Sequence, residues 1–397
     1  MAINTSTPVL ILGGKENSLS LVRNLGSQGI PVRVSGPSTC WGLSSRYCLE
    51  AFRIPRDTKS ADYWYELLLG SGSARLQGHI LIPCCDDAIE FIARHTEELA
   101  ANYVLDDATP ELRLAMLDKQ RTLVLAEQAG TAAPKFWNIE AATDLETIRS
   151  QVEFPVMVKP LNTVQFYRIF GRKLFIVEKD FDEVVEKVRL AQQHDQAVMV
   201  VEMIPGPDSL LSSYYTYINK NRKSLFHYTK RVLRRYPVNR GGACYHVAEW
   251  LPDTAAAGRQ FFKGIGFTGL GNIEFKRDLR DGKLKIIEVN ARFTAAQELL
   301  VRSGAPIDLI LYCHLTGQEL PQFSSYKQSL IFWYPMRDFL AFVELWRRNE
   351  LTAMEWLRSW FPRRLLSPLH KITDPMPSIA AAGAVMGKAL RSLAQVR

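Results

Sequence analysis

Residues 271–292 read GNIEFKRDLRDGKLKIIEVNAR, and no other stretch of the chain constrains its structure so closely. Two runs that are typical of β-strands, 272–276 and 284–290, flank a polar turn centred on Asp281-Gly282. A glycine directly after an aspartate suits a turn that needs positive φ. The stretch therefore predicts an antiparallel hairpin.

The predicted hairpin sorts its side chains onto two faces. If the strands pair about Asp281, Glu274 lies directly opposite Glu288. Because side chains alternate along a strand, one face then carries Asn272, Glu274, Glu288 and Asn290, and the other carries Ile273, Phe275, Ile287 and Val289. The second face is apolar throughout, so we expect it to belong to the core.

Two carboxylates that face each other across a strand pair are destabilising. A bound cation would reverse the sign of that interaction, and Mg²⁺ is usually held by one or two carboxylates together with substrate phosphates. Glu274, Glu288 and Asn290 are therefore candidate metal ligands. The hairpin alone leaves a second interpretation open, a solvated face with unpaired acids.

Further motifs precede the hairpin in a fixed order. They are Asp118-Lys119, the segment PVMVKP at 155–160 and the segment VEMIPG at 201–206. With the ending Glu-x-Asn-x-Arg at 288–292, this ordered set resembles the ATP-grasp superfamily, specifically its carboxylate–amine ligase branch, and more distantly biotin carboxylase and carbamoyl-phosphate synthetase. The resemblance covers roughly residues 8–320.

The resemblance implies an α/β and α+β protein, in which a parallel-sheet domain precedes an ATP-grasp domain and a helical extension ends the chain. The residue pattern agrees, because strands alternate with helices in the N-terminal part. The expected divisions are a pre-ATP-grasp α/β domain at 1–110, an ATP-grasp domain at 111–320, and a helical C-terminal extension at 321–397. Within the second, we expect a small lobe at about 130–200, a hinge at 201–206 and a large lobe at 207–320.

The resemblance also implies how ATP would be bound. Lys119 and Lys159 are expected to act as point charges on the phosphate oxygens. Glu202, Met203 and Ile204 are expected to form the hinge that holds adenine, with the Glu202 carboxylate accepting from its amino group. Asp208 is expected to accept from the ribose hydroxyls, and a simple turn residue is the alternative.

The sequence departs from the family after the lysine-bearing strand, where many members have a glycine-rich loop over the phosphates. Here residues 161–173 read LNTVQFYRIFGRK and contain only Gly171. We expect a stiffer loop in which Arg168 or Lys173 replaces backbone amides as a phosphate ligand. The alternative is an ordinary hairpin.

The most concentrated charge of the chain lies in TKRVLRRYPVNRGG, residues 229–242. Lys230 and Arg234 match the basic pattern of the family best, so they are expected to act on an anion in catalysis. A solvated strand face is the alternative for Arg231 and Arg235. His227 and His246 are expected to be structural.

The implied reaction is the ATP-dependent joining of a carboxylate to an amine. Mg²⁺ on Glu274, Glu288 and Asn290, with Mn²⁺ as an alternative, would spread the charge that develops on the γ-phosphate. An amine would then attack the acyl phosphate to give an amide, ADP and phosphate. Arg292 is expected to pair with the carboxylate or the acyl phosphate. The alternatives are an ATP-dependent carboxylase or carbamoyl-phosphate-type enzyme, and a non-catalytic nucleotide-binding protein.

The 397 residues have an ordinary globular composition, 47% hydrophobic and 23% charged. The six cysteines include no C-x-x-C pair. The N-terminus has no charged segment before its short apolar run, so it does not resemble a signal peptide. We therefore expect a cytoplasmic protein.

The net charge is +8, and residues 331–397 hold ten Lys/Arg against five Asp/Glu. No nucleic-acid module is recognisable, so the expected partners are small-molecule carboxylate and amine substrates and not nucleic acid. Phe339, Phe342 and Trp346 recur at helical spacing, which favours helices that pack on the body of the protein. A peripheral membrane contact through these basic helices, and a homodimer, are left open.

Overall fold

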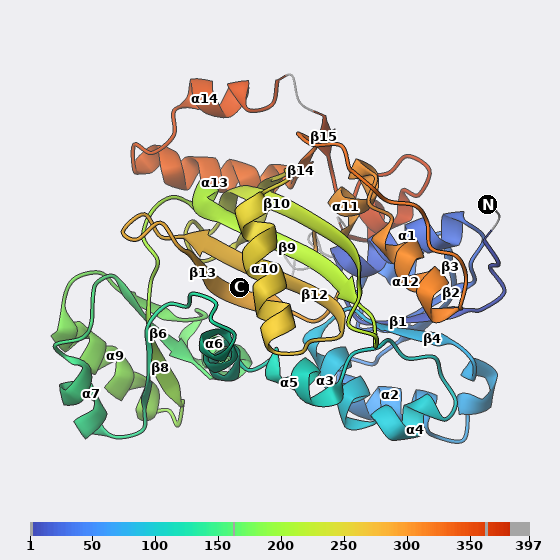
Figure 1. Ribbon diagram of the computed structural model, residues 1–397, viewed down its shortest axis with the longest axis horizontal. Coiled ribbons are helices and arrows are strands. Elements are labelled where there is room, and N and C mark those ends of the chain that lie inside the picture. Colours follow the sequence, from blue (N-terminus) through green and yellow to red (C-terminus); the bar gives the residue numbers. More distant parts are fainter. Residues whose placement is uncertain (1–2, 162, 362–363, 382–397) are drawn as a thin grey trace, which may run out of the picture.

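The computed structural model describes residues 3–161, 163–361 and 364–381, which contain three β-sheets (Figure 1). The first sheet is parallel, in the order β3-β2-β1-β4, and confirms the parallel sheet predicted for the N-terminal part. Its strands are β1 (Val9–Leu12), β2 (Val32–Gly36), β3 (Cys48–Arg53) and β4 (Ile80–Pro83). Every residue of β1 and β4 is buried, because helices cover both faces of such a sheet.

Four helices accompany this sheet: α1 (Glu16–Ser27), α2 (Ser60–Leu68), α3 (Asp86–Arg94) and α4 (Thr96–Ala100). Two short 3₁₀ turns, Trp41–Ser44 and Ser73–Leu76, lie between them. Two short helices follow, α5 (Pro110–Ala115) and α6 (Lys119–Gln128), and they are separated by a break at 116–118. The break follows from Asp118, which caps α6 by accepting from the Arg121 amide at 3.0 Å.

The second sheet forms a small lobe that lies at the lower left of Figure 1. It is antiparallel, in the order β5-β8-β6-β7. Its strands are β5 (Phe136–Ile139), β6 (Val156–Pro160), β7 (Phe175–Val177) and β8 (Val198–Glu202), with helices α7 (Ala142–Ile148) and α9 (Phe181–Gln192).

The segment after β6 is a helix, α8 (Thr163–Phe170), and neither a stiff loop nor a hairpin as the sequence suggested. The reason is an aromatic cluster at helical spacing. The Phe166 ring is fully buried, with its centroid 4.6 Å from that of Phe170 and 5.2 Å from that of Phe175 in β7. The packing of these three aromatic rings fixes the helix against the small sheet.

The third sheet has seven strands, in the order β13-β12-β9-β10-β11-β14-β15. They are β9 (Leu211–Ile218), β10 (Ser224–Tyr236), β11 (Gly242–Ala248), β12 (Gly269–Arg277), β13 (Leu284–Asn290), β14 (Ile331–Trp333) and β15 (Leu365–Leu366), and a 3₁₀ turn, Asp208–Leu210, precedes β9. Helix α10 (Pro252–Gly264) covers one face of this large sheet (Figure 1). Apolar side chains of Tyr214, Phe262, Ile273 and Phe275 meet there.

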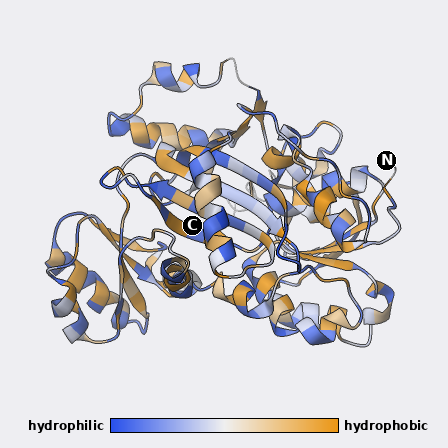
Figure 2. Cartoon of the chain, viewed as in Figure 1, coloured by the Kyte–Doolittle hydropathy of each residue, from blue (hydrophilic) through white to orange (hydrophobic). Residues whose placement is uncertain are grey.

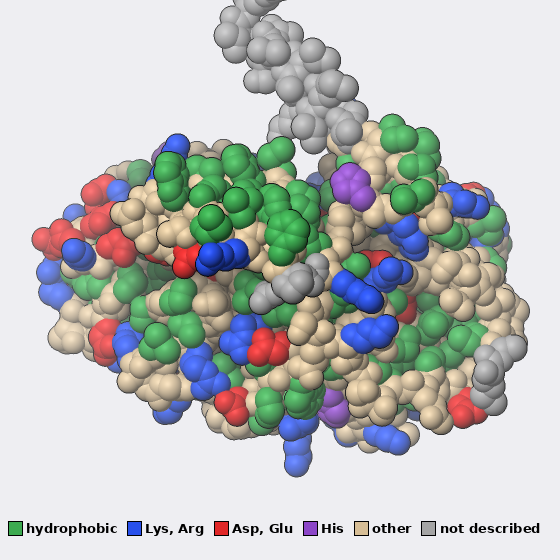
Figure 3. Space-filling view, turned by 90° about the horizontal axis from the view of Figure 1, so that it is seen from above, with side chains coloured by type: hydrophobic (Ala, Val, Ile, Leu, Met, Phe, Trp, Pro, Cys, Tyr) green, Lys and Arg blue, Asp and Glu red, His purple; other side chains and the backbone are tan. Residues whose placement is uncertain are grey.

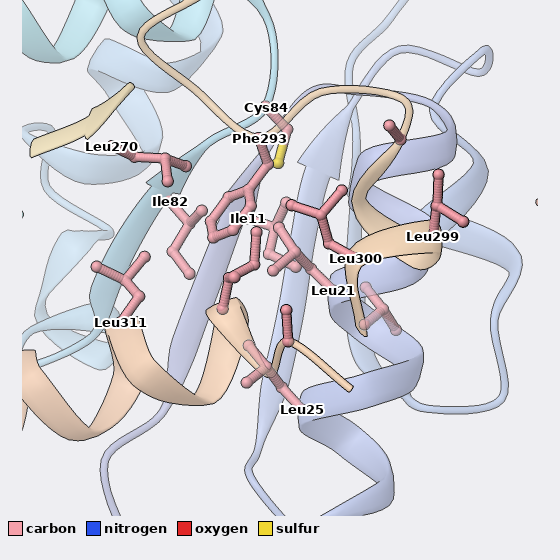
Figure 4. Close-up of a cluster of buried hydrophobic side chains, with 14 of the residues drawn as sticks. Ile11, Leu21, Leu25, Ile82, Cys84, Leu270, Phe293, Leu299, Leu300 and Leu311 are labelled. Atoms are coloured by element: carbon pink, nitrogen blue, oxygen red, sulfur yellow. The ribbon is translucent and has the colours of Figure 1, made fainter. Parts of the chain in front are cut away.

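The other face of the large sheet shares a core with the first sheet. Helices α11 (Gln297–Ser303) and α12 (Ile307–Leu315) lie between the two sheets and supply Leu299, Leu300 and Leu311. Figure 4 shows Phe293, which follows the hairpin, pointing into this cluster near Ile11 and Ile82. The two sheets are therefore held by one continuous apolar core.

The C-terminal part contains the expected helices, α13 (Pro335–Arg347) and α14 (Ala353–Arg358), and in addition strands β14 and β15, which extend the large sheet. The chain then returns to the first domain. There Asp374 pairs with Arg23 of α1 at 2.9 Å and accepts from the Ser45 hydroxyl at 2.7 Å and the Arg46 amide at 2.9 Å. No local pattern in the sequence predicts this return, because Arg23 and Asp374 are far apart in the chain.

Candidate active site

The hairpin forms with the predicted register. Asn272 pairs with Asn290, Ile273 with Val289, and Glu274 with Glu288. One detail differs, because the register shifts after Glu274 and Phe275 pairs with Ile286. Ile286 and not Ile287 therefore fills the core, and Ile287 is the extra residue of a β-bulge.

The polar face of the hairpin sets two carboxylates side by side. Burial raises the pKa of Glu274, and the neighbouring Glu288 carboxylate raises it further. The Asn290 amide donates to Glu288 Oε1 at 3.1 Å and to Asn272 Oδ1 at 3.2 Å, so the amides order the face. A cation would relieve the repulsion between the carboxylates. This donor set fits Mg²⁺.

Within the described part of the chain, no group of three or more His, Cys, Asp or Glu side chains is placed to hold a metal ion. The hairpin offers two carboxylates and a carboxamide oxygen. That set matches a magnesium site completed by substrate phosphates better than a site made wholly of protein ligands.

Lysines from other parts of the chain lie near Glu288. Lys159, near the end of β6, lies close enough to Glu288 and to Lys119 that both act on its charge. Burial and then the Lys119 ammonium lower the pKa of Lys159 to about 8. Burial also lowers the pKa of Lys119, at the start of α6, where Lys173 adds a third positive charge. The structure thus brings together Lys119, Lys159 and Lys173.

Lys230 of β10 lies on the same face of the large sheet as Glu274, and its side chain is almost wholly buried. Burial lowers the pKa of Lys230, while Glu274 and Glu288 raise it. The two carboxylates and this ammonium therefore compensate one another in part. His246 lies nearby, fully buried and neutral because burial and Lys230 both lower the pKa of its ring.

Arg234 does not reach this face. Its Nε donates to Asp338 Oδ1 of α13 at 2.6 Å, and its guanidinium lies over the Tyr245 ring at 4.0 Å. The cause is a β-bulge in β10, where Val232 pairs with His246 and Arg234 already pairs with Tyr245. Leu233 is the extra residue, so Arg234 points toward the C-terminal helices. Arg234 thus lies away from the two carboxylates, and its contacts do not support the predicted catalytic role.

The same bulge turns Arg235 onto the face of the carboxylates, where its charge acts on Glu274. Arg235 pairs with Asp208 at 2.7 Å, and Asp208 also accepts from the Asn239 amide at 3.3 Å. Asp208 is thus buried in an ion pair, which is more than the turn role or the ribose contact that the sequence suggested. Strict alternation along β10 would place Arg234 on this face, so the sequence pattern did not identify Arg235.

The predicted hinge residues lie at the end of β8 and directly after it. The Glu202 amide donates to the Lys135 carbonyl at 2.8 Å, and the Met203 amide donates to the Pro155 carbonyl at 3.0 Å. Ile204 is buried beside them. The Glu202 carboxylate accepts from the Lys135 amide at 3.1 Å and is also ion-paired with Arg280 and Lys285. An adenine amino group would therefore share this carboxylate with two cations.

Lys276 belongs to the same neighbourhood and could have been found from the sequence. It lies two residues beyond Glu274 on β12 and so shares its face. Its ammonium donates to the Gly206 carbonyl of the hinge at 2.6 Å. Burial and then the Arg235 charge lower the pKa of Lys276 to about 8.

Arg292 connects the hairpin to the first domain. Its Nε donates to Asp86 Oδ1 at 2.8 Å, and Glu288 lies near enough to act on its charge. Asp86 begins α3, directly after β4. Asn17 of α1 donates to the Cys84 and Phe293 carbonyls at 2.7 Å each and so links the end of the first sheet to the segment after the hairpin.

A scan against protein-family models gave no match. Among curated proteins, the chain is 26% identical over 232 residues to a D-aspartate ligase of Enterococcus faecium (strain Aus0004), a match that covers 55% of this chain and 54% of that protein. The chain thus spans about half the length of the curated relative that it matches.

Three solved structures share the fold. A biotin carboxylase from Campylobacter jejuni has a TM-score of 0.63 at 16% identity, covering 81% of this chain and 74% of its own. An N5-carboxyaminoimidazole ribonucleotide synthetase bound to ADP has a TM-score of 0.62 at 10% identity, covering 83% and 82%. An L-amino acid ligase from Bacillus licheniformis has a TM-score of 0.58 at 17% identity, covering 79% and 75%. The fold predicted from the sequence is confirmed.

Proposed function

We propose, from the ATP-grasp fold of this chain, that it is an ATP-dependent ligase joining a carboxylate to an amine through an acyl phosphate, with release of ADP and phosphate. One observation carries the proposal. Lys119 and Lys159 lie near enough to Glu288 to interact with its charge, and Glu288 pairs with Glu274 across the hairpin. A triphosphate that bridges these charges would satisfy both sets at once.

Each residue has a distinct role in this proposal. Lys119 and Lys159 hold the phosphate oxygens, and Lys173 is the third cation in reach of them. Glu274, Glu288 and Asn290 would hold Mg²⁺, which neutralises charge on the phosphates during transfer, and Mn²⁺ is an alternative occupant. Met203 and Ile204 line the adenine side, while Glu202 anchors the hinge through its ion pairs.

The large sheet supplies the groups for the substrates. Lys230 lies buried beside Glu274 and can neutralise an attacking carboxylate. Arg292, between Glu288 and Asp86, is placed to pair with the acyl phosphate. Arg235 replaces Arg234 as the second basic residue of this face. Positioning and electrostatic stabilisation would supply most of the rate.

The relative named D-aspartate ligase supports an amino acid as one of the two small-molecule substrates. The proposal includes a cytoplasmic location and no nucleic-acid partner. A homodimer and a peripheral contact of the C-terminal helices with a membrane are compatible with it. A carboxylase that activates bicarbonate is the second candidate, because a biotin carboxylase is among the similar folds.

The test is a matrix of acids and amines in which ADP and phosphate release are followed together. A ligase releases ADP only when a matched acid and amine are both present, whereas a carboxylase responds to bicarbonate. With ¹⁸O-labelled acid, label should appear in the released phosphate. Formation of AMP and pyrophosphate, or label kept wholly in the amide, would overturn the acyl phosphate.

A further inference from the structure

Exposed apolar side chains are concentrated in the C-terminal part of the chain. Of the seventeen large hydrophobic side chains that are exposed within the described residues, ten lie between Met336 and Ile379. Figure 3, which views the molecule from above Figure 1, shows hydrophobic side chains gathered over α13 and α14. Such a concentration marks a surface that contacts something other than water.

Helices α13 and α14 are attached to the body by their inner sides. Asp338 and Ala341 of α13 are fully buried, and Trp356 of α14 stacks on Phe342 with ring centroids 4.5 Å apart. The outer sides are not needed for this attachment. They present an outer face that we define as Met336, Phe339, Leu340, Trp346, Met354, Leu357 and Phe361.

The exposed fractions on this outer face are large, 72% for Met336, 57% for Trp346 and 74% for Phe361. Figure 2 shows hydrophobic residues along much of α13. Each such side chain would gain about 25 cal/mol for every Å² of apolar surface removed from water. Covering the outer face would therefore stabilise the protein considerably relative to leaving it in water.

Outside its buried ion pairs, the described C-terminal part carries more positive than negative side chains. Two of the acidic residues, Asp338 and Asp374, form buried ion pairs with arginines from other parts of the chain, so their charges are neutralised there. The remaining described acids are Glu344, Glu350 and Glu355, against the basic residues Arg337, Arg347, Arg348, Arg358, Arg364 and Lys371. An apolar face in a part of the chain with excess positive charge complements a negatively charged, partly apolar surface.

We propose that this outer face binds the surface of a lipid bilayer that contains anionic lipids. Tryptophan and phenylalanine would enter the boundary of headgroups and acyl chains, while the arginines contact the headgroup phosphates. No helix within the described residues is long and apolar enough to cross a bilayer, so the contact is peripheral. A second copy of the chain fits less well, because a two-fold contact would bring the same excess of positive charge against itself.

The test is flotation of the full chain with vesicles of phosphatidylcholine alone and with vesicles that also contain phosphatidylglycerol. The wild type should float with the anionic vesicles, and less so at high salt. The variant Phe339→Ser/Trp346→Ser/Phe361→Ser should lose roughly tenfold or more of this binding. A matched control, Leu49→Ser/Tyr65→Ser/Trp250→Ser, removes three exposed apolar side chains elsewhere and should bind as the wild type does.

Thermal melting and ADP release should be the same for both triple variants, which separates lipid binding from folding and from the proposed reaction. Flotation of the Phe339/Trp346/Phe361 variant at the wild-type level would overturn the proposal, and so would a wild type that binds no anionic vesicles. If sedimentation instead shows a wild-type dimer that this variant dissociates, a second copy covers the face and the bilayer does not.

Discussion

The surroundings of Lys159 disfavour the charged form of its side chain. It is half-buried in β6, and the Lys119 ammonium is near, so the pKa of Lys159 falls to about 8. Glu288 offsets this only in part. A bound polyanion would stabilise the charged form of Lys159 and raise its pKa again. Nucleotide binding should therefore be coupled to the protonation of this side chain.

We expect the affinity for ATP to fall as the pH rises through about 8. Free Lys159 loses its proton there, whereas the bound form keeps it, so binding takes up a proton between the two pKa values. Above pH 8 the association constant should decrease by up to about tenfold per pH unit for each such lysine. Calorimetric titration in two buffers with different heats of ionisation measures the proton uptake directly.

The substitution Lys159→Arg provides the control, because arginine stays charged throughout this range. It should weaken or abolish the pH dependence contributed by position 159 even if some affinity is lost. An unchanged pH profile in Lys159→Arg would show that a different group, such as Lys276 with its similarly lowered pKa, controls the binding.

Glu288→Gln should reduce ATP turnover by about a hundredfold or more, the size of effect seen when one electrostatic contact to the transition state is lost. The fold should be as stable as before, because the change removes one of two facing like charges. The measurements are ADP release against Mg²⁺ concentration and a thermal melt. Glu249→Gln, which alters only the pair with Arg231, should retain turnover. Wild-type turnover in Glu288→Gln would refute the metal assignment.

At the scale of elements, the strand and helix pattern was largely predictable from the sequence, and the bulges were not. The register of β12 and β13 followed from a turn residue and from alternation, so Glu274 and Glu288 were placed together correctly. A bulge depends on packing across several strands, and strict alternation misassigns the residues beyond it. For this reason the sequence pattern predicted Arg234 on the face of the site, where the structure has Arg235. It likewise predicted Ile287 in the core, where the structure has Ile286.

The partners in long-range ion pairs could not be predicted from the sequence either. Neither the pairing of Arg234 with Asp338 nor that of Arg23 with Asp374 leaves a local signal, because each joins residues far apart in the chain. Helix α8 was missed for a different reason. The family pattern suggested a loop, while the spacing of Phe166 and Phe170 favoured a helix against β7.

Asp338 connects α13 to the large sheet, so its loss should be structural. It accepts from Arg234, from the Trp333 indole at 3.1 Å and from the Trp356 indole at 3.0 Å. Asp338→Ala should lower the free energy of unfolding by about 3–5 kcal/mol, since it leaves a buried guanidinium unpaired. Denaturant unfolding measures this.

The double variant Arg234→Leu/Asp338→Leu should lose much less stability than the sum of the two single changes, because no charge is left without a partner. It should also keep ADP release close to that of the wild type. If Arg234→Leu abolished turnover in a protein that is still folded, Arg234 would be catalytic after all.

At the scale of the whole molecule, the C-terminal part holds the other domains together. Strands β14 and β15 extend the large sheet, α13 covers Arg234, and the segment around Asp374 reaches α1. The N-terminal sheet and the large sheet also share one core through α11 and α12. The relative position of the lysines and the carboxylates therefore depends on segments that do not belong to the site.

Deletion of residues 331–397 should lower the melting temperature and reduce the soluble yield. It would expose the edge of β11 and leave the buried charges of Arg23 and Arg234 without their partners. Circular dichroism melts of the purified truncation measure the effect. Asp374→Asn, which keeps the shape and removes one charge, should show a smaller shift in the same direction. A truncation that is soluble and as stable as the full chain would contradict this account of the C-terminal part.

The ion pair of Arg23 and Asp374 also determines how early, during synthesis of the chain, the N-terminal sheet can complete its packing. The two residues are 351 positions apart, so at about 5–20 residues per second a ribosome adds the aspartate roughly 20–70 seconds after the arginine. Until then the guanidinium of Arg23 has no carboxylate to meet it, and the nascent N-terminal sheet cannot complete its packing. The newly made chain is thus open to chaperones and proteases until the segment that carries Asp374 has emerged.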